Sequence, residues 1–201
     1  TLSGGALGVL VADVTGHGLG AALIMTGARA CVRSLCAAAA GPAQVLSAAN
    51  NLLAKDLDGG NFLSLLLAVF DPADGTLRYS SAGHDPPVFY RPGGDEFIEG
   101  DSTGPLLGIL EGMEFQAAGP FKLQPGDVLL LMTDGLFECM NAADEPFGKE
   151  RVKDVLKAHA AEGAGEILAA LLAAAEAWSD GLPPRDDITA VVVKVTEDWA
   201  K

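Results

Sequence analysis

The fold is decided between Phe62 and Ser81, where the sequence reads Phe62-Leu-Ser-Leu-Leu-Leu-Ala-Val-Phe70, then Asp71-Pro-Ala-Asp-Gly75, then Thr-Leu-Arg-Tyr-Ser-Ser81. The first run is apolar except for Ser64, and the last run alternates at Leu77, Tyr79 and Ser81. An apolar run followed by turn residues and by an alternating run is typical of a β-hairpin. The centre of the chain therefore predicts antiparallel sheet.

One strand and two helices are expected before the hairpin. Leu7–Asp13 is a compact apolar run, which is consistent with a buried strand that carries Asp13 at its end. From Leu19 to Leu35, apolar or small residues recur every four positions, and this period predicts a helix. Gly41 interrupts the pattern, and Pro42 suits the first turn of a second helix.

After the hairpin, strands and helices occur in separate runs. Short strands are expected at Pro87–Arg91, Glu96–Glu99, Glu114–Phe121 and Val128–Thr133, and a last strand at Ile188–Val195. Helices are expected near Gly135–Met140, Gly148–Ala161 and Ala164–Ser179. Runs of this kind, without a β-α-β alternation, indicate an α+β domain with a mainly antiparallel sheet.

The composition excludes several classes of protein. The 201 residues carry 13 Lys and Arg against 27 Asp and Glu, a net charge of −14, so the clustered cations that bind nucleic-acid phosphates are missing. Three cysteines fit neither a disulfide framework nor a zinc pattern. The longest apolar runs are about half of the ~20 residues that span a bilayer. We expect one domain of a cytoplasmic protein, without a membrane span or a nucleic-acid partner.

The segment Asp13-Val-Thr-Gly-His-Gly-Leu-Gly20 follows the first strand and allows three interpretations. Gly16, Gly18 and Ala21 match a dinucleotide-binding fingerprint, but the second strand with an acidic residue about 20 positions on is missing. Asp13 is otherwise a turn or helix cap, or a metal ligand at a strand end, where glycines bring backbone atoms close to an ion. This segment alone does not separate the last two interpretations.

Two further apolar strands are expected beside aspartates. Val128–Met132 precedes Asp134, and Asp186 and Asp187 directly precede the last strand. If these strands lie side by side, several carboxylates crowd one edge, where a cation offsets their repulsion. Hard oxygen donors without cysteine favour Mg²⁺ or Mn²⁺ over Zn²⁺, and two such ions ~3.5–4 Å apart support phosphoryl hydrolysis. The repeated pattern favours the metal-ligand interpretation of Asp13.

Five short motifs occur in the order Asp13-Val-Thr-Gly-His-Gly18, Ser81-Ala-Gly-His-Asp-Pro-Pro87, Gly104-Pro-Leu-Leu-Gly108, Leu131-Met-Thr-Asp-Gly-Leu136 and Asp186-Asp-Ile-Thr189. Together they resemble the metal-dependent PPM family of protein serine/threonine phosphatases, in particular its bacterial sporulation stage II protein E and sigma-factor regulatory type. The resemblance covers nearly the whole chain. It implies a four-layer α-β-β-α sandwich with two mainly antiparallel sheets flanked by helices, two Mn²⁺ or Mg²⁺ ions, and hydrolysis of phosphoserine or phosphothreonine.

The resemblance also implies roles for single residues. Asp13 matches the aspartate that bridges both metals, and Val14 matches the position whose backbone carbonyl completes a metal shell. Asp134 and Asp186 match further carboxylate ligands, with Asp187 as a metal-site partner of Asp186. The implied reaction is in-line attack on phosphorus by a metal-bridging hydroxide, without a phosphoenzyme.

Other residues of these motifs are candidates for supporting the ligands or contacting the substrate, namely Gly16, His17, Gly135 and Arg185. For Arg185, an ion pair with Asp186 or Asp187 is the simpler expectation. PPM proteins also carry a Gly-Gly-Asp segment shortly before the first strand, which Thr1–Leu10 does not provide. We therefore expect an N-terminal strand and a further ligand upstream.

By resemblance, the expected substrate is a phosphorylated protein of the anti-sigma-factor antagonist type. The chain would then be one output module beside an N-terminal sensor or receiver domain, with a homodimer as one possible assembly. Two alternatives stay open at this stage. A catalytically degenerate domain would keep the fold and bind a partner protein, and a nucleotide-binding oxidoreductase would hold a dinucleotide at the first motif.

Overall fold

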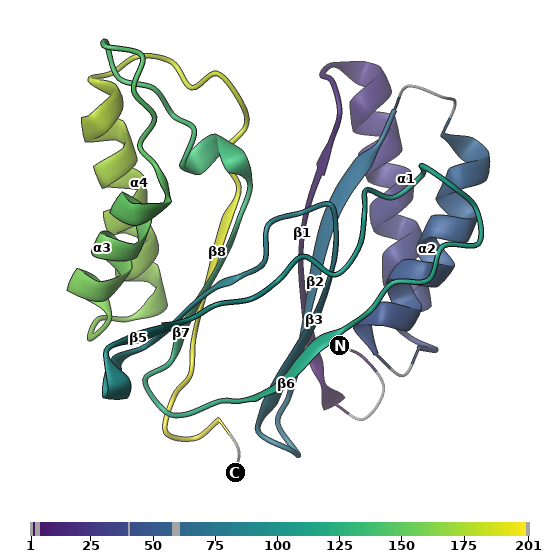
Figure 1. Cartoon of the computed structure of the whole chain (residues 1–201), viewed down its shortest axis with the longest axis horizontal. Coiled ribbons are helices and arrows are strands. Elements are labelled where there is room, and N and C mark those ends of the chain that lie inside the picture. Colours follow the sequence, from purple (N-terminus) through teal and green to yellow (C-terminus); the bar gives the residue numbers. More distant parts are fainter. Residues whose placement is uncertain (1, 3–4, 40, 58–60, 200–201) are drawn as a thin grey trace. The chain divides into compact units, whose positions relative to one another are not determined.

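The computed structural model describes residues 2, 5–39, 41–57 and 61–199, and the chain forms two compact units (Figure 1). The first unit comprises Thr1–Pro86 and Asp101–Leu123, and the second comprises Pro87–Gly100 and Gln124–Trp199. Each unit therefore combines segments that are far apart in the sequence.

The first unit is a four-stranded antiparallel sheet with two helices packed on it (Figure 1). Its strands, in spatial order, are β1 (Leu7–Val14), β2 (Leu63–Asp71), β3 (Thr76–Ala82) and β6 (Ala118–Lys122), and its helices are α1 (Leu19–Leu35) and α2 (Pro42–Asp56). β2 and β3 form the expected hairpin, with Asp71 opposite Thr76. One core joins the sheet to the helices, and its buried side chains include Val14, Leu63, Leu65, Val32 and Leu46.

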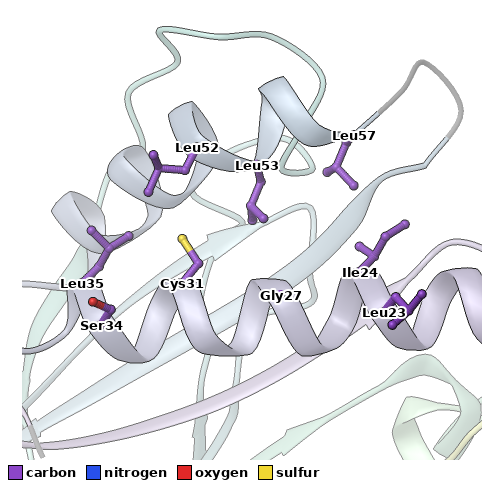
Figure 2. Close-up of a pocket in the computed structure, with 9 residues that line it drawn as sticks. All are labelled: Leu23, Ile24, Gly27, Cys31, Ser34, Leu35, Leu52, Leu53 and Leu57. Atoms are coloured by element: carbon purple, nitrogen blue, oxygen red, sulfur yellow. The ribbon is translucent and has the colours of Figure 1, made fainter.

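α1 forms where the four-residue period predicts a helix, but only part of its apolar surface is buried. Ala28 and Val32 face the core, whereas Leu19 and Leu23 are 77% and 64% exposed. Ala28 and Val32 lie where α1 packs on β1 and α2, and a short side chain lets a helix approach its neighbours closely. Leu23 borders a groove of about 590 Å³ between α1 and α2 (Figure 2). Its walls include Leu23, Ile24, Cys31, Leu52 and Leu57.

The second unit also consists of a four-stranded antiparallel sheet and two long helices. Its strands, in spatial order, are β5 (Glu96–Ile98), β4 (Val88–Arg91), β7 (Val128–Met132) and β8 (Ala190–Lys194), and its helices are α3 (Lys149–His159), α4 (Ala164–Ser179) and the single turns η2 (Pro92–Gly94) and η3 (Asp134–Leu136). All pairings are antiparallel. β7 is buried along its whole length and packs with Leu156 of α3 and Ile167 of α4. Two antiparallel sheets with two long helices each confirm the α+β class.

No helix in the described part of the chain is both long enough and apolar enough to cross a membrane.

Several elements are shorter than expected, and β6 and the helix expected near Gly135–Met140 differ clearly from the prediction. β6 starts late, at Ala118, because the preceding backbone bonds to side chains instead of to a strand. The Phe115 N–H donates to Ser47 Oγ at 2.9 Å, and the Gln116 carbonyl accepts from Ser80 Oγ at 2.7 Å.

The helix expected near Gly135–Met140 is only the single turn η3. The backbone groups that would continue it pair with the segment that follows. The Cys139 carbonyl accepts from the Phe147 N–H at 2.8 Å, and the Phe137 carbonyl accepts from the Gly148 N–H at 2.7 Å. Since these carbonyls are already engaged, the turn is not extended.

Candidate metal centre

Asp13 is the penultimate residue of β1 and lies directly opposite Ser64 of β2 in the antiparallel register. Pairing continues past the end of β1. The Thr15 N–H donates to the Phe62 carbonyl at 3.0 Å, and Thr15 Oγ1 accepts from the Phe62 N–H at 2.9 Å. Asp13 is half-buried, and it is carried by backbone that is paired on both sides of it along the strand.

The backbone carbonyl of Val14 points away from β2. Leu63, its partner in the register, uses its own N–H and C=O on Leu107, at 3.3 and 2.9 Å. Val14 and Leu63 are therefore a pair without mutual hydrogen bonds, and the Val14 backbone groups face the outer side of β1. Among the strands that the structure describes, β1 is an edge of its sheet. A carbonyl in this place is a suitable ligand for a hard cation.

The turn after β1 depends on its glycines. Gly16 and Gly18 have φ angles of +90° and +87°, a region that favours glycine because it has no β-carbon. His17 between them is exposed. Gly16 thus has a backbone role in the turn, and His17 is placed on the surface of the first unit.

The ends of β7 and β8 bring together the backbone segments that carry the later aspartates. The Thr133 N–H donates to the Thr189 carbonyl at 2.9 Å, and the Thr189 N–H donates to Thr133 Oγ1 at 2.9 Å. Thr133 Oγ1 in turn donates to the Asp187 carbonyl at 3.1 Å. Asp134 follows Thr133 directly, so it lies beside the segment that carries Asp186 and Asp187.

Gly135 permits this close approach. A β-carbon at position 135 would lie 2.5 Å from the Asp187 carbonyl oxygen and 3.3 Å from that of Asp186. Side chains do not tolerate such contacts with backbone atoms, so the two segments meet only because residue 135 is glycine. Gly135 is buried, whereas Asp134, Asp186 and Asp187 are exposed.

Arg185 pairs with a different aspartate from the ones expected. Its Nη2 donates to Asp144 Oδ1 at 2.5 Å, and both side chains are well exposed. The predicted ion pair with Asp186 or Asp187 is therefore wrong. One reason is that Asp186 Oδ1 already accepts a hydrogen bond from the Asp187 N–H at 2.7 Å. The Asp186 carboxylate is therefore directed toward the neighbouring backbone.

The motif Ser81–Pro87 contacts Ser64, the residue opposite Asp13 in the β1–β2 ladder. His84 is buried, with 6% of its surface exposed, and its Nδ1 lies 2.9 Å from Ser64 Oγ. The neighbouring Gly83 N–H donates to the Gly104 carbonyl at 2.8 Å. Sequence reasoning missed Ser64, although its place as a polar residue inside an apolar run was a usable signal.

The motif Gly104–Gly108 is hydrogen-bonded to a side chain of α2. Buried Asn50 donates through Nδ2 to the Leu110 carbonyl at 2.7 Å and accepts the Gly108 N–H at Oδ1 at 3.0 Å. The same loop forms the Leu63–Leu107 bridge. Asn50 was also missed, because nothing in the helix sequence indicates that one polar residue faces inward toward a distant loop.

The oxygen donors suit a hard divalent cation. The carboxylates of Asp13, Asp134 and Asp186 and the Val14 carbonyl are of the type that Mg²⁺ and Mn²⁺ prefer. Asp13 and Val14 belong to the first unit, and Asp134 and Asp186 belong to the second. Across residues 2, 5–39, 41–57 and 61–199, no three His, Cys, Asp or Glu side chains are grouped as a metal-binding cluster. The types of donor atom therefore suit Mg²⁺ or Mn²⁺.

Sequence comparison places the chain in a family. A profile of stage II sporulation protein E (SpoIIE) matches residues 3–196. Phosphoserine phosphatase RsbU of Bacillus subtilis (strain 168) is 29% identical over 133 residues, which cover 66% of this chain and 39% of RsbU. The chain therefore spans well under half of the length of this relative.

Solved structures agree on the fold. The SiaA-PP2C domain of Pseudomonas aeruginosa superposes with a TM-score of 0.79 at 22% identity, over 95% of this chain and 80% of that one. The catalytic domain of the serine threonine protein phosphatase PstP, in complex with 2 manganese ions, superposes with a TM-score of 0.64 at 18% identity, over 98% and 91%. The chain therefore belongs to the stage II sporulation protein E family and has the α+β sandwich fold of PPM-type (PP2C) protein phosphatases.

Proposed function

We propose that the chain is a single PPM-type domain that hydrolyses phosphoserine or phosphothreonine on a protein, with two Mn²⁺ or Mg²⁺ ions. The observation that carries this proposal is the approach of Gly135 to Asp187, which sets Asp134 beside Asp186 in a chain of the SpoIIE family. The relative RsbU is a phosphoserine phosphatase, and the PstP structure holds manganese. Both support the reaction and the class of cation.

The proposed ligands are Asp13, the Val14 carbonyl, Asp134 and Asp186. When bound, the cations supply a water that is nucleophilic near neutral pH and offset the charge on the phosphate. The contribution of the chain is to hold the donors in place. The β1–β2 ladder fixes Asp13, the outer side of β1 presents the Val14 carbonyl, and the Asp187 N–H orients Asp186 Oδ1.

The substrate phosphate approaches a protein with a net charge of −14. Overall attraction therefore does not bring the substrate to the site, and recognition depends on the local field of the cations and on shape. We propose a phosphorylated anti-sigma-factor antagonist as the substrate, in the cytoplasm. We also propose that an N-terminal sensor or receiver domain of a longer protein controls the domain, and that the domain acts as a homodimer.

Manganese-dependent release of phosphate from a phosphoserine peptide tests the proposal. Asp134→Asn and Asp186→Asn each remove a ligand charge, and a loss of several kcal/mol of metal stabilisation corresponds to about 100-fold or more in kcat. Asp154→Asn is the matched control, because Asp154 is an exposed aspartate on α3, and it should keep full activity.

Two outcomes contradict the proposal in different ways. Full activity of Asp134→Asn would remove Asp134 from the ligand set. Folded full-length protein that binds Mn²⁺ weakly and releases no phosphate would instead favour the degenerate domain that binds a partner protein without catalysis.

A further inference from the structure

Ser64 lies between the proposed ligand Asp13 and the buried ring of His84. Ser64 and Asp13 are directly opposite in the β1–β2 ladder. Directly opposite residues have Cα atoms about 5.5 Å apart in a hydrogen-bonded pair, and their side chains project from the same face of the sheet. The hydroxyl of Ser64 is therefore a close neighbour of the Asp13 carboxylate.

The face in question is the one that α1 and α2 do not cover. Val14 and Leu63, one position along each strand, belong to the core that contains both helices. Side chains alternate between the faces of a sheet, so Asp13 and Ser64 project to the other side. Ser64 is a polar residue in a strand whose remaining central residues are apolar and buried, so burial of apolar surface does not explain its presence.

His84 fixes the Ser64 side chain from the other direction. Its Nδ1 lies 2.9 Å from Ser64 Oγ, and its ring is buried. The backbone that carries this ring is also fixed. The Gly83 N–H donates to the Gly104 carbonyl, and Gly83 has a φ angle of +63°. A β-carbon on Gly83 would lie 2.8 Å from the Leu106 backbone nitrogen, so this loop is closely packed. A hydroxyl held by such a ring is restricted in rotation.

We propose that His84 and Ser64 form a positioning pair for the Asp13 carboxylate. The ring of His84 fixes the rotamer of Ser64, and the Ser64 side chain limits the conformations of the carboxylate on the neighbouring strand. This inference rests on the proposed function, because it takes Asp13 to be a metal ligand. Residues that orient ligands in this way typically change metal affinity or activity by 10–100-fold when they are removed.

Calorimetric titration with Mn²⁺ alone tests the pair without relying on catalysis. Ser64→Ala removes the hydroxyl with little change in volume, and His84→Ala removes the ring. Each is expected to weaken Mn²⁺ binding by about 10-fold, and the double variant should lose no more than either single one, because the two side chains act as one unit. In peptide hydrolysis, kcat should fall while KM stays near its wild-type value.

Conservative variants and controls separate positioning from folding. Ser64→Thr keeps a hydroxyl and suits a strand, so it should bind Mn²⁺ like the wild type and more tightly than Ser64→Ala. Ser34→Ala on the exposed side of α1 and His159→Ala on α3 are the matched controls and should bind like the wild type. Thermal unfolding of each variant checks that the sheet is intact.

The outcomes distinguish this inference from the function on which it rests. Full-length wild-type protein that neither binds Mn²⁺ nor hydrolyses the peptide overturns the proposed function and the inference together. A wild-type chain that does both, with Ser64→Ala and His84→Ala unchanged, overturns the inference alone. Losses that add in the double variant also overturn it, because two independent side chains would then be involved.

Discussion

The carbonyl oxygen of Asp187 lies 2.5 Å from the place where a β-carbon on Gly135 would be. Gly135→Ala must therefore move either η3 or the segment before β8, and forced overpacking of this kind costs about 1–3 kcal/mol. Because the movement separates Asp134 from Asp186, we predict weaker Mn²⁺ binding together with lower stability. Urea unfolding and calorimetric titration measure the two effects.

Gly165→Ala is the control for this substitution. Gly165 lies within α4, and a β-carbon there meets no atom within 4 Å. Alanine in a helix interior is favoured over glycine by roughly 0.5–1 kcal/mol. Gly165 is the second residue of α4, so this variant should gain less than that in stability and bind Mn²⁺ like the wild type. If Gly135→Ala behaves in the same way, the contact with Asp187 does not constrain the site.

Asp127 and Arg91 form a buried pair in the second unit. Asp127 is 1% exposed and accepts from Arg91 Nε at 3.1 Å, from Arg91 Nη2 at 2.9 Å and from the Gln124 N–H at 2.8 Å. The hydrogen bond to Asp127 also raises the pKa of Arg91 above its usual value. Removing one partner of a buried pair typically costs about 3–5 kcal/mol, and we predict such a loss for Asp127→Ala in urea unfolding.

The exposed pair between Asp144 and Arg185 provides the comparison. Their side chains are 79% and 65% exposed, and exposed ion pairs contribute about 0–1 kcal/mol. Asp144→Asn keeps a residue type that tolerates the positive φ angle of this position, so it should lose no more than this amount. Equal losses for Asp127→Ala and Asp144→Asn would mean that burial does not strengthen the Arg91 pair.

Local patterns were sufficient to predict most of the fold. The hairpin of β2 and β3 depends on residues that are close in sequence, so its strands and turn are visible in the alternation of polar and apolar residues. The inward face of α1 was less clear, because its whole four-residue stripe is apolar. The packing partners decide that Ala28 and Val32 are buried and that Leu23 is not.

In the candidate site, too, some features are visible in the local sequence and others depend on tertiary contacts. Asp13, Asp134 and Asp186 are indicated by their places beside apolar strands, which is a local feature of the sequence. The bond between Arg185 and Asp144 joins residues 41 positions apart. The contact of Ser64 with His84 likewise depends on how β2 and β3 are paired. Such contacts follow from tertiary structure, and no local pattern contains them.

The difference between the two sides of α1 is itself measurable. Val32 is 3% exposed and Leu23 is 64% exposed. Val32→Ala removes two buried methyl groups, at about 0.8 kcal/mol each with a further cost for the cavity, so we predict a loss of about 2 kcal/mol in urea unfolding. Leu23→Ala should change stability by less than about 0.5 kcal/mol. The reverse order would mean that the helix packs through its longer side chains.

Asp95 predicts a dependence of stability on pH. Lys157 Nζ donates to its Oδ2 at 2.7 Å, and the Tyr90 hydroxyl donates to its Oδ1 at 2.8 Å. The bond from Lys157, followed by the bond from Tyr90, lowers the pKa of Asp95 below the usual 3.8. A carboxyl with a lowered pKa in the folded state stabilises the protein above its unfolded pKa, and this contribution is lost as the pH falls through the folded pKa.

We therefore predict that Asp95→Asn lowers the Tm at pH 6 and that the difference from the wild type disappears at about pH 2. Asparagine tolerates the positive φ angle of 49° at this position, so the substitution removes charge without straining the backbone. The effect at pH 6 should be small and should decrease with added salt, because Asp95 and Lys157 are both more than half exposed. A difference in Tm that persists unchanged at about pH 2 would assign the effect to lost geometry around Tyr90 rather than to the charge of Asp95.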